Sequence, residues 1–259
     1  MTPPADLGRV VHAEWIKFRT VRSSFWALLT SAALSIGLGP AFLPTIIDNY
    51  DGDPGEAADV AAANGWWFHG LQVGTLAMLI LGVLVATAEY ASGTIRATLA
   101  AVPSRTRVLA AKVACFAAVA LVAGAVQAAG AFLIARPFLS GRGIDVPLTD
   151  PAAWRGVAIS TLAVAAAGLL GLGAGMAIRH TAGAIGLAVA VVMVVVPALA
   201  HLLPAGWDPL RIALPSTAID TMITPTASTL GQGPATAVTF GYVAAVLTVA
   251  GALFARRDA

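Results

Sequence analysis

The chain has 259 residues, of which 58% are hydrophobic and only 11% carry a charge. Soluble globular proteins are about one-quarter charged, and apolar runs of about 20 residues recur here, so a soluble domain is excluded. A net charge of +2 gives no reason to expect a nucleic-acid partner, and the single cysteine, Cys115, excludes an internal disulfide. We therefore expect an all-α polytopic membrane protein embedded in a lipid bilayer.

Residues 1–23 are expected to form a cytoplasmic tail followed by an amphipathic interface helix. Apolar side chains recur there at helical spacing, while basic side chains, Lys17 and Arg19 among them, lie beside this stripe. The apolar stripe consists of Leu7, Val11, Trp15 and Phe18. Glu14 falls inside the stripe, where an acid is costly unless it is paired. Its expected partner is Lys17, or else an arginine from the loop between the second and third spans or from a docked subunit.

Residues 24–259 are expected to form a transmembrane domain of six helical spans, each long enough to cross a bilayer. The spans cover residues 24–45, 67–88, 108–134, 154–178, 183–203 and 237–254. Pro40 and Pro44 predict a kink or early fraying of the first span, and Pro197 predicts a kink in the fifth.

Two polar connections are expected on the outer side of the membrane. Residues 46–65 carry five acids and no Lys or Arg, which predicts a solvated loop, because the twelve-residue loop with a terminal Glu that binds calcium is absent. Trp66 and Trp67 follow this loop and are expected in an aromatic belt at the membrane interface. The outer loop 204–236 is too polar and too rich in proline to cross the bilayer, and a short helix is expected at 216–223.

The distribution of charge predicts the orientation of the chain. With the amino terminus inside, the inner side holds eleven basic and four acidic residues, whereas the outer side holds four basic and nine acidic residues. Because cytoplasmic loops carry the excess of Lys and Arg, both termini are expected in the cytoplasm and the protein in the cell membrane.

The fourth span has a face of small residues, in which Gly171 and Gly175 form a GxxxG pair. Faces of this kind let two helices approach closely. We expect this face to pack tightly against a neighbouring span.

The polar segment 89–107 lies between the second and third spans. Its middle, residues 94–102, has apolar side chains at i, i+4 and i+7, which predicts a short amphipathic helix on the cytoplasmic side. Gly93 allows a break before this helix, and Pro103 ends it. A short helix tied to two spans can pass motion from a soluble partner into the membrane, although an ordinary basic loop explains the composition equally well.

Several kinds of chemistry have no motif in this sequence. It contains no Walker loop, and neither GxSxG nor HExxH occurs. Its four histidines are scattered over different segments, so no metal site or catalytic cluster is expected. Ionisable residues are almost absent from the spans, which argues against an ion-coupled transporter and fits a membrane subunit that another protein energises.

Two stretches together resemble the type-2 ABC transporter permeases, and small six-span actinobacterial members look most similar. The first is a Glu-Trp-x-Lys-x-Arg sequence beginning at Glu14. The second runs from Glu89 through Gly-Thr-x-Arg-x-x-Leu to Pro-x-Arg. The matched residues are Glu14, Trp15, Lys17, Arg19, Glu89, Gly93, Thr94, Arg96, Leu99, Pro103 and Arg105.

The resemblance implies a membrane-spanning permease subunit of an ATP-driven transporter. Such chains form homodimers or heterodimers and bind separate ATP-binding subunits, which hold the ATP and magnesium. It also implies that the matched residues from Glu89 to Arg105 form a coupling element. In this element, Glu89 is expected to pair with Arg96 or Arg105. Export of a hydrophobic or amphipathic compound is the expected activity, with a non-transporting scaffold or sensor subunit as the alternative. A membrane-embedded enzyme is disfavoured, because intramembrane catalysis needs polar residues.

Overall fold

A computed structural model of the protein describes residues 7–204, 206–225 and 231–256. This part of the chain is helical and contains no strand, and six of its helices are long and apolar enough to cross a membrane. The expectation of an all-helical, multi-span membrane protein is therefore confirmed. The six candidate spans are Arg22–Asp48, Ala57–Ala91, Arg105–Ser140, Pro151–Ile178, Thr181–Leu202 and Gln232–Arg256.

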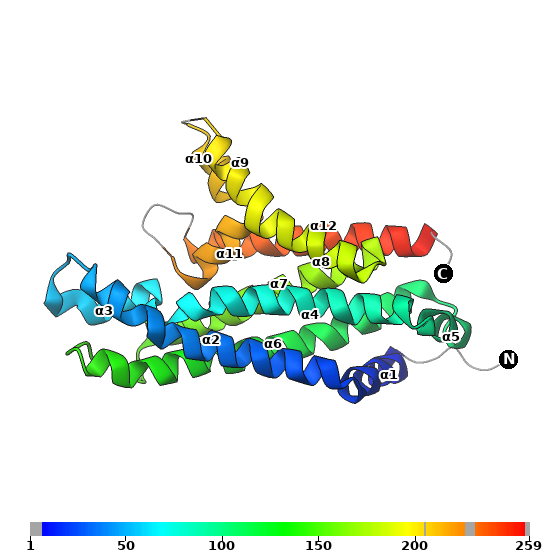
Figure 1. Ribbon diagram of the computed structural model, residues 1–259, viewed down its shortest axis with the longest axis horizontal. Helices are drawn as coiled ribbons and strands as arrows, with labels where there is room; N and C mark the ends of the chain where they lie inside the picture. The colour runs from blue at the N-terminus through cyan, green and yellow to red at the C-terminus, as the bar shows by residue number, and fades with distance from the viewer. Residues whose placement is uncertain (1–6, 205, 226–230, 257–259) are drawn as a thin grey trace.

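The long helices run side by side along the longest axis of the molecule (Figure 1). Helix α7 (Pro151–Ile178) is central, since it contacts α4 (Leu71–Ala91), α6 (Arg105–Ser140) and α12 (Gln232–Arg256). Helix α2 (Arg22–Asp48) packs against α4 and α6 on the other side. The short helices α1 (Leu7–Thr20) and α5 (Thr94–Ala101) lie at one end of this bundle, which we call the α1 end. Helix α3 (Ala57–Asn64) lies at the opposite end, the α3 end.

The second span begins earlier than expected. The segment predicted as a solvated loop contains α3, which ends at Gly65 with a φ of 61°, and a 3-10 turn, η2 (Trp66–Gly70), then leads into α4. Trp66 and Trp67, which are predicted to form an interfacial belt, do not face the surroundings of the molecule, because both rings are buried within the protein. The ring of Trp67 lies 4.9 Å from that of Phe132 in α6, so contacts between helices bury it.

Proline has different effects in the first, third and fifth spans. Helix α2 continues through Pro40 and Pro44 to Asp48, so the predicted early fraying is wrong, and α6 continues through Pro137 to Ser140. In the fifth span, α8 (Thr181–Ala190) and α9 (Val196–Leu202) are joined by a π-helical turn, η3 (Val191–Val195). The turn ends two residues before Pro197, whose missing N–H and bulky ring disturb the helical ladder in the preceding turn.

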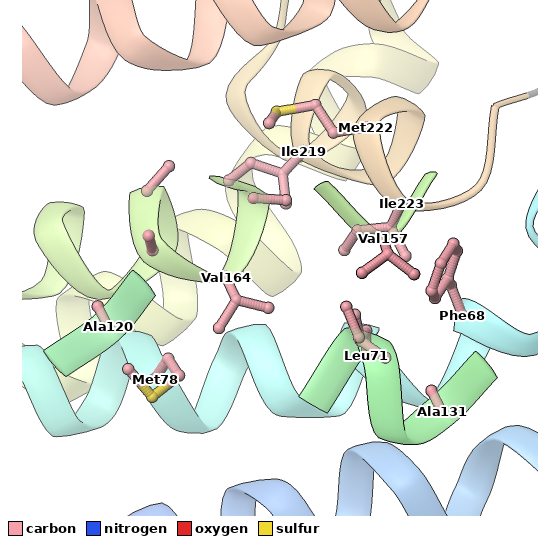
Figure 2. Close-up of a cluster of buried hydrophobic side chains, with 14 of the residues drawn as sticks. Phe68, Leu71, Met78, Ala120, Ala131, Val157, Val164, Ile219, Met222 and Ile223 are labelled. Carbon is pink, nitrogen blue, oxygen red and sulfur yellow. The ribbon is translucent and has the colours of Figure 1, made fainter. Parts of the chain in front are cut away.

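The outer segment contains α10 (Asp208–Ile212) and α11 (Pro215–Ile223), so the short helix expected at 216–223 is present. Figure 2 shows Ile219, Met222 and Ile223 of α11 gathered near Val157 of α7. Helix α11 thus buries its apolar face against the bundle, as an amphipathic helix does.

The glycines of α7 lie against α4. A Cβ atom on Gly175 would lie 2.8 Å from the Cβ of Ala86 and 2.9 Å from the carbonyl oxygen of Val83. A Cβ on Gly171 would collide with the carbonyl oxygen of Leu79. The small-residue face therefore brings the two backbones into close contact, as its GxxxG spacing predicts.

Candidate functional site

Helix α1 packs against α6 and α2 at the α1 end of the bundle. Val10 and Glu14 are its buried residues, whereas Leu7 and Trp15 of the predicted stripe are exposed. The apolar side chains of α1 thus occupy two faces, one turned to the protein and one to its surroundings. Glu14 belongs to the face turned to the protein, and this placement decides its partners.

Four charged side chains from three helices meet beneath α1. We call them the charge cluster: Glu14 and Lys17 of α1, Glu89 of α4 and Lys112 of α6. The ammonium nitrogen of Lys17 lies 2.6 Å from Oε1 of Glu14 and 2.9 Å from Oε1 of Glu89. The ammonium nitrogen of Lys112 lies 2.6 Å from Oε2 of Glu14 and 2.9 Å from Oε1 of Glu89. The two carboxylates and two ammonium groups therefore alternate and balance in charge.

The charge cluster is largely removed from solvent. Glu14 is 5% exposed, Glu89 is 7% exposed and Lys112 is 4% exposed. The side chain of Lys17 is 36% exposed and closes the cluster toward the outside. Such burial makes each charge dependent on its partners, because an isolated charge in a low-dielectric interior is very costly.

Lys17 also ties the charge cluster to α5. Its ammonium donates to Oγ1 of Thr98 at 3.2 Å, in addition to its bonds with Glu14 and Glu89. Burial opposes its charge, but the hydrogen bonds and negative charges of Glu14 and Glu89 raise the pKa of Lys17 above its ordinary value. One side chain therefore connects α1, α4 and α5.

Helix α5 has the position and ends that the sequence predicts. Gly93 precedes it with a φ of 70°, in the left-handed region that favours glycine, and Pro103 follows its end at Ala101. Ile95 is buried, and Leu99 packs against the core. Arg96 is exposed on another face, and Thr94 is also exposed. The helix is thus held on one side by apolar contacts and presents a basic residue on the other.

The predicted pairing of Glu89 is wrong, whereas that of Glu14 with Lys17 is confirmed. Among the described residues, the ion-pair partners of Glu89 are Lys17 and Lys112, not Arg96 or Arg105. Arg105 instead donates to the carbonyl oxygen of Phe254 at 2.9 Å, near the end of α12. Glu14 pairs with Lys17 as expected, but its second partner is Lys112 rather than an arginine of the loop. The pairing follows from packing, because α1 lies along α6 and brings Glu14 to Lys112.

Lys112 has no expected site role in the sequence. It lies near the start of the apolar third span, where a lysine is usual at a membrane boundary, and none of its sequence neighbours marks it as buried.

The remaining predicted residues lie outside the charge cluster. Trp15 and Arg19 are exposed on α1, and the rings of Trp15 and Phe18 stack with centroids 6.4 Å apart. Gly171 and Gly175 contact α4 and do not enter the charge cluster.

A cleft of about 390 Å³ opens beside the charge cluster. The four cluster residues line one part of it, and apolar side chains line much of the rest. The apolar lining residues are Phe18, Val21, Leu81, Leu84, Val85 and Phe116. We call this the amphipathic cleft. Cys115 also lines it, so the only cysteine of the chain lies in its wall.

A second cleft, of about 350 Å³, lies on the opposite side of α4, toward the α3 end. Gln72 and Thr75 line it together with Asp220 of α11 and apolar residues of the fifth span. Asp220 is exposed by surface area, but the packing of protein atoms around its carboxyl desolvates it and raises its pKa to about 6. Within the described part of the chain, no three His, Cys, Asp or Glu side chains gather into a metal site.

No protein-family model matches the sequence, and no curated protein matches it. Functional inference therefore rests on the sequence motifs and on the geometry of the charge cluster.

Proposed function

We propose that this chain is the membrane-spanning permease subunit of an ATP-driven ABC transporter. In this proposal it lies in the cell membrane with both termini, α1 and α5 on the cytoplasmic side. It exports a hydrophobic or amphipathic compound as one of a pair of permease chains. Separate ATP-binding subunits hold ATP and magnesium, so the chain itself performs no catalysis.

The observation that carries the proposal is the connection of α5 to three other helices. Helix α5 joins the ends of α4 and α6, and Thr98 accepts a hydrogen bond from Lys17. Lys17 in turn is paired with Glu14 of α1 and Glu89 of α4. A displacement of α5 would therefore act on α1 and on two spans together, which is what a coupling helix requires.

The exposed side of α5 supports a docking role. Arg96 is exposed on α5, and another face of this helix is fixed by the buried Ile95. In our mechanism, closure of the ATP-binding subunits presses on this surface, and the charge cluster transmits the movement to α4 and α6. The close contact of α4 with α7 at Gly171 and Gly175 carries the movement across the bundle.

The proposal is tested by affinity purification of the chain in mild detergent, with identification of the proteins that accompany it. We expect an ATPase in stoichiometric amount, which is lost from the variant Arg96→Glu. Arg155→Glu is the matched control, because Arg155 is also exposed on a helix but lies at the α3 end. Recovery of the wild-type chain alone, where known permease complexes survive, would favour a scaffold or sensor subunit instead.

Transport itself needs a separate measurement. With the copurified ATPase, reconstituted vesicles are expected to show movement of a fluorescent amphipathic compound that depends on ATP. The variant Gly93→Pro should keep ATP hydrolysis but lose transport, because proline cannot adopt the positive φ that joins α5 to α4. Unchanged transport by this variant would contradict the coupling role of α5.

A further inference from the structure

The charge cluster leaves one hydrogen-bond acceptor unused, at a residue that lines the amphipathic cleft. Both lysines bond to Oε1 of Glu89, and no described residue donates to its Oε2. Glu89 is 7% exposed and lines the cleft. A buried carboxylate oxygen without a donor is unfavourable, and because Glu89 is a residue of the cleft wall, this atom points to a ligand that supplies the donor.

The ion pair of Glu89 with Lys112 also leaves a hydrogen-bond donor unused. A lysine ammonium has three N–H groups, and Lys112 uses two of them on Glu14 and Glu89. Lys17 bonds to three acceptors and has no N–H group to spare. The unmet acceptor and the unmet donor therefore belong to one pair, Glu89 and Lys112, whose atoms are 2.9 Å apart.

Charge balance decides which ligand fits. Two carboxylates already face two ammonium groups, so an added cation would meet two lysines and an added anion would meet two glutamates. In neither case would the new interactions offset the free energy that the ion loses when it leaves water. A hydroxyl group carries no net charge, donates one hydrogen bond and accepts others, so it satisfies Glu89 and Lys112 together.

We infer that the amphipathic cleft binds the uncharged hydroxyl head of an amphiphile, with its apolar tail along the wall formed by Leu84, Val85 and Phe116. The volume of about 390 Å³ falls within the range of small-molecule sites. The ligand is either a lipid of the bilayer with a free hydroxyl or a smaller amphipathic alcohol. Binding would hold α1, α4 and α6 together, since all three form the cleft.

The test uses Cys115 as the reporter, because it is the only cysteine and lines the cleft. The full chain is reconstituted in phosphatidylcholine vesicles, whose head group has no O–H or N–H group. Alkylation by N-ethylmaleimide is then followed by intact-protein mass spectrometry with dodecanol, dodecyl methyl ether or dodecylammonium present. At ten times its Kd, dodecanol should slow alkylation about tenfold, because only the unoccupied fraction reacts.

Comparison among these probes isolates the hydroxyl group. The ether only accepts and the ammonium only donates, so both should protect Cys115 much less than dodecanol does. Equal protection by dodecanol and the ether would overturn the proposal, since the cleft would then select only an apolar chain. Tighter binding of dodecylammonium, or no protection by any probe, would overturn it too.

The variant Glu89→Gln gives a second readout. Lys17 and Lys112 can only donate, so the amide oxygen must face them and the amide N–H₂ takes the place of Oε2. That group donates to an alcohol or an ether alike, so the preference for dodecanol over the ether should disappear. A preserved preference would refute the role of Oε2.

A further pair of variants keeps the charge cluster intact. Ser23 is exposed and lines the cleft, so Ser23→Trp should block entry and abolish protection by dodecanol. Thr30→Trp, also on α2 and exposed but outside the cleft, should leave protection unchanged. Protection that survives Ser23→Trp would place the alcohol elsewhere and overturn the proposal.

The source of the ligand is distinguished in a separate arm. Vesicles containing 1,2-dioleoylglycerol, which has one free hydroxyl, are compared with vesicles containing trioleoylglycerol, which has none. Protection by the first alone identifies a bilayer lipid as the ligand, whereas protection by dodecanol alone identifies a smaller alcohol. Both results support the hydroxyl site, and both are independent of any ATPase.

Discussion

Replacing Lys112 with methionine removes one cation from the charge cluster without changing the length of the side chain much. Lys112 is 4% exposed and pairs with both glutamates, at 2.6 Å and 2.9 Å. After the change, two buried carboxylates share Lys17 alone, and the cluster has a net charge of −1. Removing one partner of a buried ion pair costs about 3–5 kcal/mol, which lowers the folding equilibrium roughly 10²-fold or more.

The free energy of unfolding is measured in detergent with a denaturant titration, followed by the fluorescence of the six tryptophans. The matched control is Arg142→Met. Arg142 also forms an ion pair of 2.9 Å, with Asp48, but the two side chains are 47% and 64% exposed. Exposed pairs contribute about 0–1 kcal/mol, so this variant should stay close to the wild type.

A double variant separates the loss of pairing from the loss of packing. Glu14→Gln together with Lys112→Met leaves Lys17 and Glu89 as one balanced pair at 2.9 Å. We expect the double variant to recover part of the stability that Lys112→Met loses. A cost below about 1 kcal/mol for Lys112→Met, or a double variant as unstable as the sum of the two single changes, would refute the reasoning.

Three further predictions follow from individual positions. Gly175→Leu should destabilise the protein by about 1–3 kcal/mol in the same titration, because a Cβ at Gly175 would lie 2.8 Å from the Cβ of Ala86. Gly186→Leu is the control and should cost little, because a Cβ at Gly186 would meet open space. Gly93→Ala should cost about 1–2 kcal/mol in that titration, because Gly93 has a φ of 70°. Asp220 has a pKa of about 6 in the folded protein, against an ordinary 3.8, so the folded state binds more protons between these values. Stability should therefore fall as the pH rises from about 4 to 6, and a pH series of melting curves should show this fall reduced in Asp220→Asn.

Each of these predictions has a result that contradicts it. Equal costs for Gly175→Leu and Gly186→Leu would mean that the contact of α7 with α4 is not tight. A neutral Gly93→Ala would mean that the chain leaves α4 through another backbone conformation. An identical pH dependence for wild type and Asp220→Asn would show that the carboxyl is as well solvated in the fold as in the unfolded chain.

Much of the fold follows from local properties of the sequence. The length of an apolar run decides whether a helix can cross a bilayer, and all six runs appear as long helices. Helix α5 was predictable for a similar reason, because Gly93 permits the turn before it and Pro103 prevents its continuation. The extension of α6 beyond its predicted end was less predictable, because Pro137 within a helix is tolerated only where neighbouring contacts offset the lost hydrogen bond.

The surroundings of the tryptophan rings could not be predicted from the sequence, because the packing of the helices decides them. Trp66 and Trp67 have the composition of an interfacial belt, but contacts with other helices bury them. A sequence pattern reports which side chains avoid water and does not distinguish lipid from protein as their surroundings.

Composition and spacing by themselves determined that this is a helical protein with six apolar segments, a basic segment between the second and third, and a buried acid on its first helix that needed a partner. Only the tertiary structure decided which partner. Glu14 and Lys112 are 98 residues apart, and Lys17 and Glu89 are 72 apart. Charges attract any opposite charge at a similar distance, so the pairing is set by which helices lie side by side. That arrangement depends on the glycine contacts and apolar packing of the whole bundle.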